Sequence, residues 1–275
     1  MPFDPPELTT LALSLHEGVA EVCLNRPERL NAMNAAMWQE LRSTFAWADA
    51  APQVRVAILR GAGRNFCSGI DLALLASVGE LVAHEDAARG REALRRLILD
   101  LQDCLSAIER CRKPVLAAIQ GACIGGAIDL VTCCDMRYAA ADASFSVREI
   151  DVGMTADVGT LQRLPRLIPD GLARELVYTG RSVSAREARR SGLVNRVYPS
   201  PDALLSGVRA IALTIASKSP LAIRGSKEML NYGRDHSIAD GLNYVATWNA
   251  AMLQSADVEE AMRAQREQRP PRYRD

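Results

Sequence analysis

Three acidic side chains with apolar neighbours are the residues of this chain best suited to chemistry. Asp129 ends a glycine-rich stretch at 121–129, and Glu149 and Asp157 follow within residues 147–159. A carboxyl group in a dry pocket has a raised pKa, and two carboxyl groups that lie close together raise each other's pKa further. Because such groups exchange protons near neutral pH, this trio predicts general acid–base chemistry.

Each acid also has a structural interpretation. Asp129 would be a favourable charge in the first turn of a helix, Asp157 would cap the N-terminus of the next helix, and Glu149 would be a solvated charge at the end of a strand. Taken singly, these interpretations are the simpler ones. Only a fold that brings the three carboxylates together favours catalysis, and their spacing alone does not do so.

Two glycine-bearing turns, 66–72 and 121–129, follow predicted buried strands. In the second turn Gly125 and Gly126 open a helix, where free backbone N–H groups and the positive end of the helix dipole point outward. One N–H group from each turn would hold the oxygen of a developing enolate. Glycine-bearing turns are also a common way for a chain to pass from a strand to a helix. The G-x-G-x-x-G fingerprint of a dinucleotide site does not occur.

The elements that must position these groups can be predicted from periodicity. Alternating apolar residues over 11–25 predict a β-hairpin, and apolar residues at helical spacing predict helices over 34–49, with Asn34 as the N-cap, and 86–112. Residues 73–93 include a loop of unclear structure that we expect to shape a ligand pocket. Further strands are predicted at 54–59, 115–119 and 136–140, and further helices at 125–134, 184–192, 219–231, 237–254 and 256–267, with another opening at Pro201.

Composition excludes several classes of function. The 275 residues carry 33 basic and 33 acidic side chains without a basic stripe, so we expect no nucleic-acid partner. No apolar run is long enough to span a membrane. The three histidines lack metal-ligand spacing, which argues against a metal site or a histidine triad. The seven cysteines are odd in number and include no C-x-x-C pair, so we expect reduced, mostly buried thiols and a cytoplasmic protein.

The chain ends support the same location. Residues 1–7 are acidic and rich in proline, unlike a secretory signal or a transit peptide, and residues 272–275 are not a peroxisomal address.

Three stretches together resemble the crotonase superfamily, also called the enoyl-CoA hydratase/isomerase family: 25–33, 66–72 and 113–135. The resemblance covers nearly the whole chain and implies an α/β fold, a spiral of β-β-α turns followed by helices that form a trimer, with two trimers commonly stacked into a hexamer. We therefore expect a core with the active site at 1–200 and a helical oligomerisation region at 201–275.

The resemblance also implies roles for individual residues. The N–H groups of Ile70 and Gly126 would form the oxyanion hole for an acyl-coenzyme A thioester, the expected partner. Coenzyme A is then part of the substrate, and neither a metal nor another cofactor is expected. The expected contacts with substrate and coenzyme A are Leu30, Asn31, Ser68, Gly69, Asp71, Leu72 and Gly125.

Within the superfamily the chain most resembles the Δ3,5-Δ2,4-dienoyl-CoA isomerases, which carry the same acids at the positions of Asp129, Glu149 and Asp157. Hydratases carry glutamate at the first position and usually glycine at the third. The resemblance implies conversion of 3,5-dienoyl-CoA to 2,4-dienoyl-CoA in fatty-acid β-oxidation, with Glu149 at C2, Asp157 at C6 and Asp129 tuning the pair. Many members of the superfamily have an aromatic residue near the position of Met262, and this chain has none there. We therefore expect the details of coenzyme A binding to differ.

Two other functions stay open at this point. A 2-enoyl-CoA hydratase would use Asp129 and Glu149 to hold a water molecule, although aspartate is one methylene shorter than the usual glutamate. A non-catalytic protein of this fold would bind acyl-CoA or RNA, and a purely structural oligomer would bind no ligand.

Overall fold

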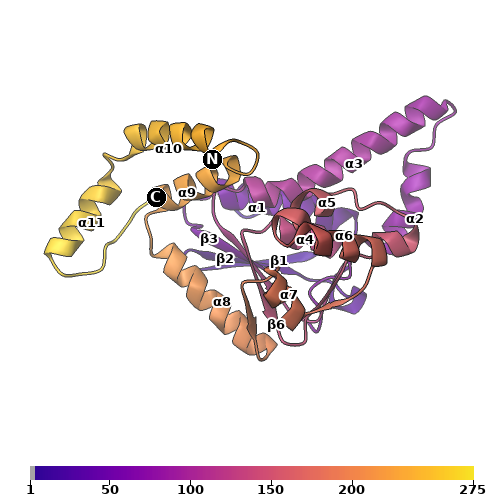
Figure 1. Cartoon of the computed structure of the whole chain (residues 1–275), viewed down its shortest axis with the longest axis horizontal. Helices are drawn as coiled ribbons and strands as arrows, with labels where there is room; N and C mark the ends of the chain where they lie inside the picture. Colours follow the sequence, from indigo (N-terminus) through magenta and orange to yellow (C-terminus); the bar gives the residue numbers. More distant parts are fainter. Residues whose placement is uncertain (1–3) are drawn as a thin grey trace.

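The computed structural model describes residues 4–275, so part of the N-terminal stretch used above lies outside the described residues. A six-stranded sheet in the order β1-β2-β3-β4-β6-β9 forms the centre (Figure 1). A second sheet has three strands in the order β5-β7-β8. The strands of the large sheet are β1 Leu11–His16, β2 Val19–Leu24, β3 Val56–Gly61, β4 Val115–Ile119, β6 Met136–Ala140 and β9 Arg196–Tyr198. The small sheet contains β5 Ala122–Ile124, β7 Ser144–Ser146 and β8 Val183–Ser184.

The predicted hairpin is confirmed, since β1 and β2 pair antiparallel. All other neighbours in the large sheet are parallel, with Val22 opposite Leu59 and Leu59 opposite Ala117. Strands β3 and β4 are apolar and buried almost throughout, as expected for parallel strands that are covered on both faces.

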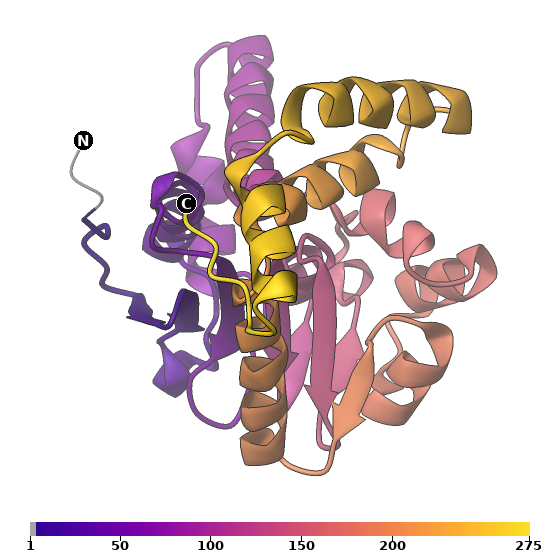
Figure 2. The ribbon, with the colours of Figure 1, turned by 90° about the vertical axis from the view of Figure 1, so that its left-hand side faces the viewer.

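Different helices cover the two faces of the sheet. Helices α1 (Ala35–Ala50) and α3 (Ala87–Arg110) pack on each other, and the side chain of Asn34 caps α1 as predicted. Helix α8 (Pro201–Ala216) lies along the opposite face, where Leu204 and Val208 pack in a buried cluster with residues of β3, β4 and β6. Figure 2 shows α8 against the sheet. The proposed boundary at residue 200 stays a prediction, and this first helix beyond it packs on the core.

The last three helices extend beyond this body: α9 Pro220–Tyr232, α10 Ile238–Met252 and α11 Ala256–Arg266 (Figure 1). An ion pair between Lys227 and Asp135 (2.7 Å) ties α9 to the core. Helix α10 has no buried residue in this single chain, and Ile238 is 84% exposed. These three helices, called the C-terminal arm below, therefore present apolar side chains that the described chain does not cover.

Several elements of the structure were not predicted. Helix α2 (Leu72–Leu81) occupies much of the expected loop at 73–93, because the Asp71 side chain accepts a hydrogen bond from Ala73 N and caps it. Helices α4 Gly126–Thr132 and α7 Ala185–Ser191, in contrast, confirm the helices predicted at 125–134 and 184–192. The remaining elements are α5 Thr160–Arg163, α6 Asp170–Thr179 and the 3-10 helices η1 Pro27–Arg29, η2 Glu149–Val152 and η3 Leu164–Arg166.

All seven cysteines are free and buried, in agreement with the sequence. Within residues 4–275 no helix combines the length and apolar character needed to cross a membrane.

Candidate active site

The two glycine turns touch each other. Cys67 and Cys123 form a β-bridge between them, and Ile124 N donates to Cys67 O at 3.1 Å. Gly69 has φ +94°, and a Cβ atom there would lie 2.7 Å from Ile124 O and 3.2 Å from Gly126 N. Only glycine allows both this backbone conformation and this approach.

The amides of Ile70 and Gly126 therefore lie close together. A Cβ atom on Gly126, the first residue of α4, would be 3.6 Å from Ile70 N. Within the described chain neither N–H group donates to another residue. Two free amide donors side by side at a helix N-terminus are the arrangement predicted for an oxyanion hole.

The segment with Leu30 and Asn31 is braced against the first turn, since Ser68 N donates to Leu30 O at 3.0 Å. The Asn31 side chain is fully buried, and its Nδ2 donates to Ala62 O and Asn65 O, both at 2.9 Å. Asn31 thus holds the loop and does not offer its side chain to a ligand. Leu30 is 51% exposed and free for contact.

Of the other predicted contacts, Asp71 is engaged internally. Its carboxylate pairs with Arg26 at 2.9 Å and caps α2. The hydrogen bond from Arg26 holds the Asp71 pKa below its usual range. Leu72 is 69% exposed, and Ser68 is half-buried.

Asp129 lies in the first turn of α4 and is completely buried. Its Oδ1 accepts a hydrogen bond from Thr160 N at 2.5 Å, whereas its Oδ2 is buried without a partner among the described residues. Burial, followed by the negative charge of Glu149, raises the pKa of Asp129 to about 7. The carboxyl group can therefore gain or lose a proton near neutral pH.

Glu149 begins η2 and is half-buried, so the interpretation as a solvated charge at a strand end is wrong. A Cβ atom on Gly125 would lie 3.4 Å from its Oε1, which places this carboxylate over the glycine that precedes the Gly126 amide. Its Oε2 is buried without a partner in the described chain. Burial, with a smaller effect from the charge of Asp157, raises the Glu149 pKa.

Asp157 does not cap α5, because the N-cap of that helix is Gly159. The backbone carbonyl of Asp157 accepts a hydrogen bond from Gln102 Nε2 of α3 at 2.6 Å, and burial raises the pKa of its side chain. Its charge acts on both Asp129 and Glu149. The fold thus brings together the three acids that sequence spacing left apart.

Sequence reasoning missed three parts of this site. Thr160 holds Asp129 through its N–H group, and Arg163 packs against the turn that carries Asp157. Neither residue stands in a motif that the sequence analysis singled out. Helix α6 forms a wall of a pocket of about 330 Å³ beside Glu149, lined mainly by apolar residues such as Ile150, Met154, Leu161 and Val177.

No group of three or more potential metal ligands gathers anywhere in residues 4–275. The functional groups of the site are carboxyl groups and backbone amides. Together they can bind a carbonyl oxygen as negative charge develops on it and exchange protons at more than one carbon.

The chain is similar over most of its length to proteins of known activity. The family model described as enoyl-CoA hydratase/isomerase matches residues 14–275. The peroxisomal Delta(3,5)-Delta(2,4)-dienoyl-CoA isomerase of Arabidopsis thaliana is 48% identical over 93% of this chain and 92% of its own length. The mitochondrial isomerase of the same name from Mus musculus is 48% identical over 93% of this chain and 79% of its own length.

A solved structure confirms the predicted fold class. The enoyl-CoA hydratase from Bacillus anthracis superposes with a TM-score of 0.88 at 33% identity, covering 97% of this chain and 99% of that one. The cytoplasmic location expected from the sequence is contradicted, because the dienoyl-CoA isomerases above are named as peroxisomal and mitochondrial. Cysteine chemistry reports a reducing environment and does not distinguish between compartments of that kind.

Proposed function

Because the chain belongs to the enoyl-CoA hydratase/isomerase family, we propose that it is a Δ3,5-Δ2,4-dienoyl-CoA isomerase of fatty-acid β-oxidation. One observation carries this proposal: the carboxylates of Asp129, Glu149 and Asp157 are close enough for their charges to interact, and Glu149 lies beside the glycine turn with the two free backbone amides. The names of the relatives from Arabidopsis thaliana and Mus musculus agree with it.

The thioester oxygen of the substrate would accept hydrogen bonds from Ile70 N and Gly126 N. Removing a proton from C2 places negative charge on that oxygen, and fixed donors stabilise this charge as it appears. Loss of one such donor typically lowers the rate by about a hundredfold or more. Exposed Leu30 and Leu72, with Ser68, Gly69 and Gly125, would line the thioester and coenzyme A.

Glu149 takes the C2 proton in this mechanism. Its Oε1 lies over Gly125 and so next to the proposed site of the thioester. The electrons of the broken C–H bond delocalise through the diene, the double bonds move to C2–C3 and C4–C5, and C6 takes up a proton. Asp157 donates that proton, since a second acid is needed at a carbon this far from C2.

Asp129 contacts the backbone of α5, and the charges of Glu149 and Asp157 act on its carboxyl group. We assign it to tuning their protonation. The chemistry requires no further cofactor in this scheme, and the apolar pocket beside Glu149 would hold part of the acyl chain.

We also propose that the C-terminal arm associates with further copies of this chain to form a trimer or hexamer. Exposed apolar side chains on α9, α10 and α11, including Leu230, Ile238, Leu242 and Met262, support this assignment. Sedimentation of the purified protein would test it. We expect Ile238→Asp combined with Leu242→Asp to yield smaller species.

The activity is tested with 3,5-dienoyl-CoA by following the near-ultraviolet absorbance of the conjugated product. We expect rapid isomerisation that is lost in Asp157→Asn. Hydration of 2-enoyl-CoA serves as the comparison reaction. Strong hydration that does not depend on Asp157, without isomerisation, would overturn the proposal in favour of a hydratase. Binding of acyl-CoA without either reaction would indicate a non-catalytic protein.

A further inference from the structure

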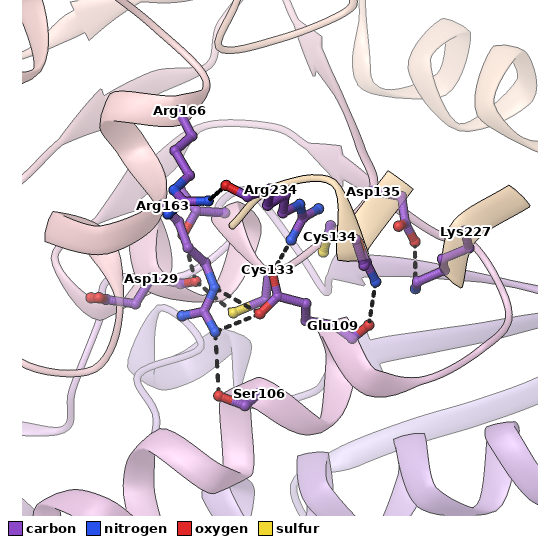
Figure 3. A network of polar contacts seen from close by, with 12 residues as sticks. Ser106, Glu109, Asp129, Cys133, Cys134, Asp135, Arg163, Arg166, Lys227 and Arg234 are labelled. Carbon is purple, nitrogen blue, oxygen red and sulfur yellow. Dashed lines mark hydrogen bonds and ion pairs between the residues drawn. The ribbon is translucent and has the colours of Figure 1, made fainter. Parts of the chain in front are cut away.

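An ion-pair network joins α5, α3 and the segment that follows α9 (Figure 3). Arg163, at the end of α5, donates from Nε and Nη2 to Glu109 Oε2 at 3.1 and 2.8 Å, and from Nη2 to Ser106 Oγ at 3.3 Å. The other oxygen of Glu109 pairs with Arg234, which follows α9. One carboxylate on α3 thus joins the catalytic turn to the C-terminal helices.

Arg163 occupies space that a side chain at position 159 would need. Gly159 has φ +134°, and a Cβ atom there would lie 1.9 Å from Arg163 Nη1. The Arg163 amide also donates to Gly159 O at 3.0 Å. The guanidinium group therefore packs directly on the backbone between Asp157 and Thr160.

The segment from Asp157 to Thr160 carries two groups of the proposed site, one at each end. Asp157 stands two residues before Gly159, and the next residue, Thr160, supplies the N–H group that holds Asp129. A displacement of Gly159 would move both. The side chains of Arg163 and Glu109 are only 18% and 23% exposed, so solvent screens their pairing weakly.

The charges around Arg163 come from three elements. Glu109 belongs to α3, Asp129 belongs to α4, and Arg234 lies beyond α9. The positive charge of Arg163 also acts on the Asp129 carboxylate. Arg163 is therefore linked to the catalytic acids both through the backbone and through its charge.

We propose that Arg163 is a positioning residue that holds the Asp157–Thr160 turn against α3, with Glu109 as its anchor. Its effect on turnover rests on the proposed function, whereas its effect on Asp129 does not. An arginine suits this role, because its planar group bonds to Ser106 and Glu109 while its Nη1 lies against the glycine. Lysine would keep the charge and lose part of this geometry.

The first test is Arg163→Gln, with Arg209→Gln as a matched control. Arg209 also donates Nε and Nη2 to a single glutamate, Glu21, but lies on α8 away from the site. We expect Arg163→Gln to lower kcat by about ten- to a hundredfold, since small misplacements of catalytic groups are costly. KM should change by less than about twofold. Arg209→Gln should leave both constants near wild type.

Glu109→Gln provides a second variant if Arg163→Gln folds poorly, since it removes the charge of the anchor and keeps its shape. We expect the same decrease in kcat, and we expect Arg163→Lys to recover part of the lost rate. Unchanged kcat in folded Arg163→Gln and Glu109→Gln would overturn the proposal.

A readout independent of activity is the pH titration of Asp129, followed by carbon NMR of labelled aspartate carboxyl groups and assigned with Asp129→Asn. Removing the nearby positive charge should raise the pH at which Asp129 titrates, and Arg163→Lys should largely restore it. An unchanged titration in Arg163→Gln would contradict the proposal. If the wild-type protein fails to isomerise dienoyl-CoA, the proposed function fails, and this titration still decides the role of Arg163.

Discussion

Thr160 N donates a hydrogen bond of 2.5 Å to Oδ1 of Asp129, a residue 31 positions earlier in the chain. This contact joins the first turn of α4 to that of α5 and fixes the direction of a completely buried carboxyl group. Oδ2 is left without a partner among residues 4–275. A buried acid with one oxygen held and the other free is costly to ionise, and it suits control of nearby proton transfers.

The burial of Asp129 predicts a stability that depends on pH. Its pKa is 3.8 before folding and about 7 in the folded protein. Between these values only the folded state keeps the proton, so stability falls as pH rises from about 4 to 7, by up to about 4 kcal/mol. Asp129→Asn cannot ionise and should lose less stability over this range. Thermal unfolding of both proteins at pH 5 and pH 8 checks this, and parallel changes in Tm would argue against a buried, neutral Asp129.

Gly69→Ala should disable the proposed oxyanion hole. The new Cβ atom would lie 2.7 Å from Ile124 O and would require φ +94°, so the turn must shift away from Gly126. We expect isomerase activity to fall by about a hundredfold or more, the typical cost of one lost donor. Gly171→Ala is the control, because a Cβ atom there meets nothing within 4 Å. Equal activity of the two variants would contradict the assignment.

If Glu149 and Asp157 act at different carbons, substitutions of the two residues should have different effects on the reaction. Asp157→Asn should still exchange the C2 protons of a 3,5-dienoyl-CoA with solvent while forming little product. Glu149→Gln should block both exchange and product formation. Mass spectrometry of substrate recovered from D2O measures this exchange and distinguishes the two variants. Loss of exchange in Asp157→Asn alone would reverse the assignment.

Substitution of Asn31 should affect stability, whereas substitution of its neighbour Leu30 should affect substrate binding. Asn31→Ala leaves the carbonyl groups of Ala62 and Asn65 without their donor, and we expect it to destabilise the fold by roughly 2–4 kcal/mol. Leu30→Ala removes an exposed side chain and should leave stability nearly unchanged while raising KM for the acyl-CoA. Urea unfolding and steady-state kinetics measure the two effects. A stable Asn31→Ala variant with weak binding would show that Asn31 contacts the substrate directly.

Local patterns were sufficient to predict the elements of the core. The hairpin β1–β2, the Asn34 cap of α1 and the short helix α7 follow from periodicity and from side chains that bond to the nearest free amides. Helix α2 was missed because its run of apolar residues contains no clear stripe and its cap, Asp71, was interpreted as a ligand contact.

The assembly of the site could not be predicted from local patterns. The contact of Asp129 with Thr160 and the position of Glu149 over Gly125 depend on how α4, η2 and α5 pack, and no spacing in the sequence encodes that packing. Arg163 was missed for the same reason, since its partner Glu109 lies on a helix 54 residues away. The resemblance to a known family implied a role for each of the three acids, and the fold supplies a physical reason to expect them to act together.

Proton transfer from C2 to C6 can be followed by locating deuterium in the product of a reaction in D2O. The purified protein would convert a 3,5-dienoyl-CoA, and proton NMR would show which carbon of the product carries the label. We expect a 2,4-dienoyl product with one deuterium at C6. Deuterium at C4 in a 2,5-diene would instead show a shorter shift served by one acid, and a 3-hydroxy product would show hydration. Either result would contradict the roles assigned to Glu149 and Asp157.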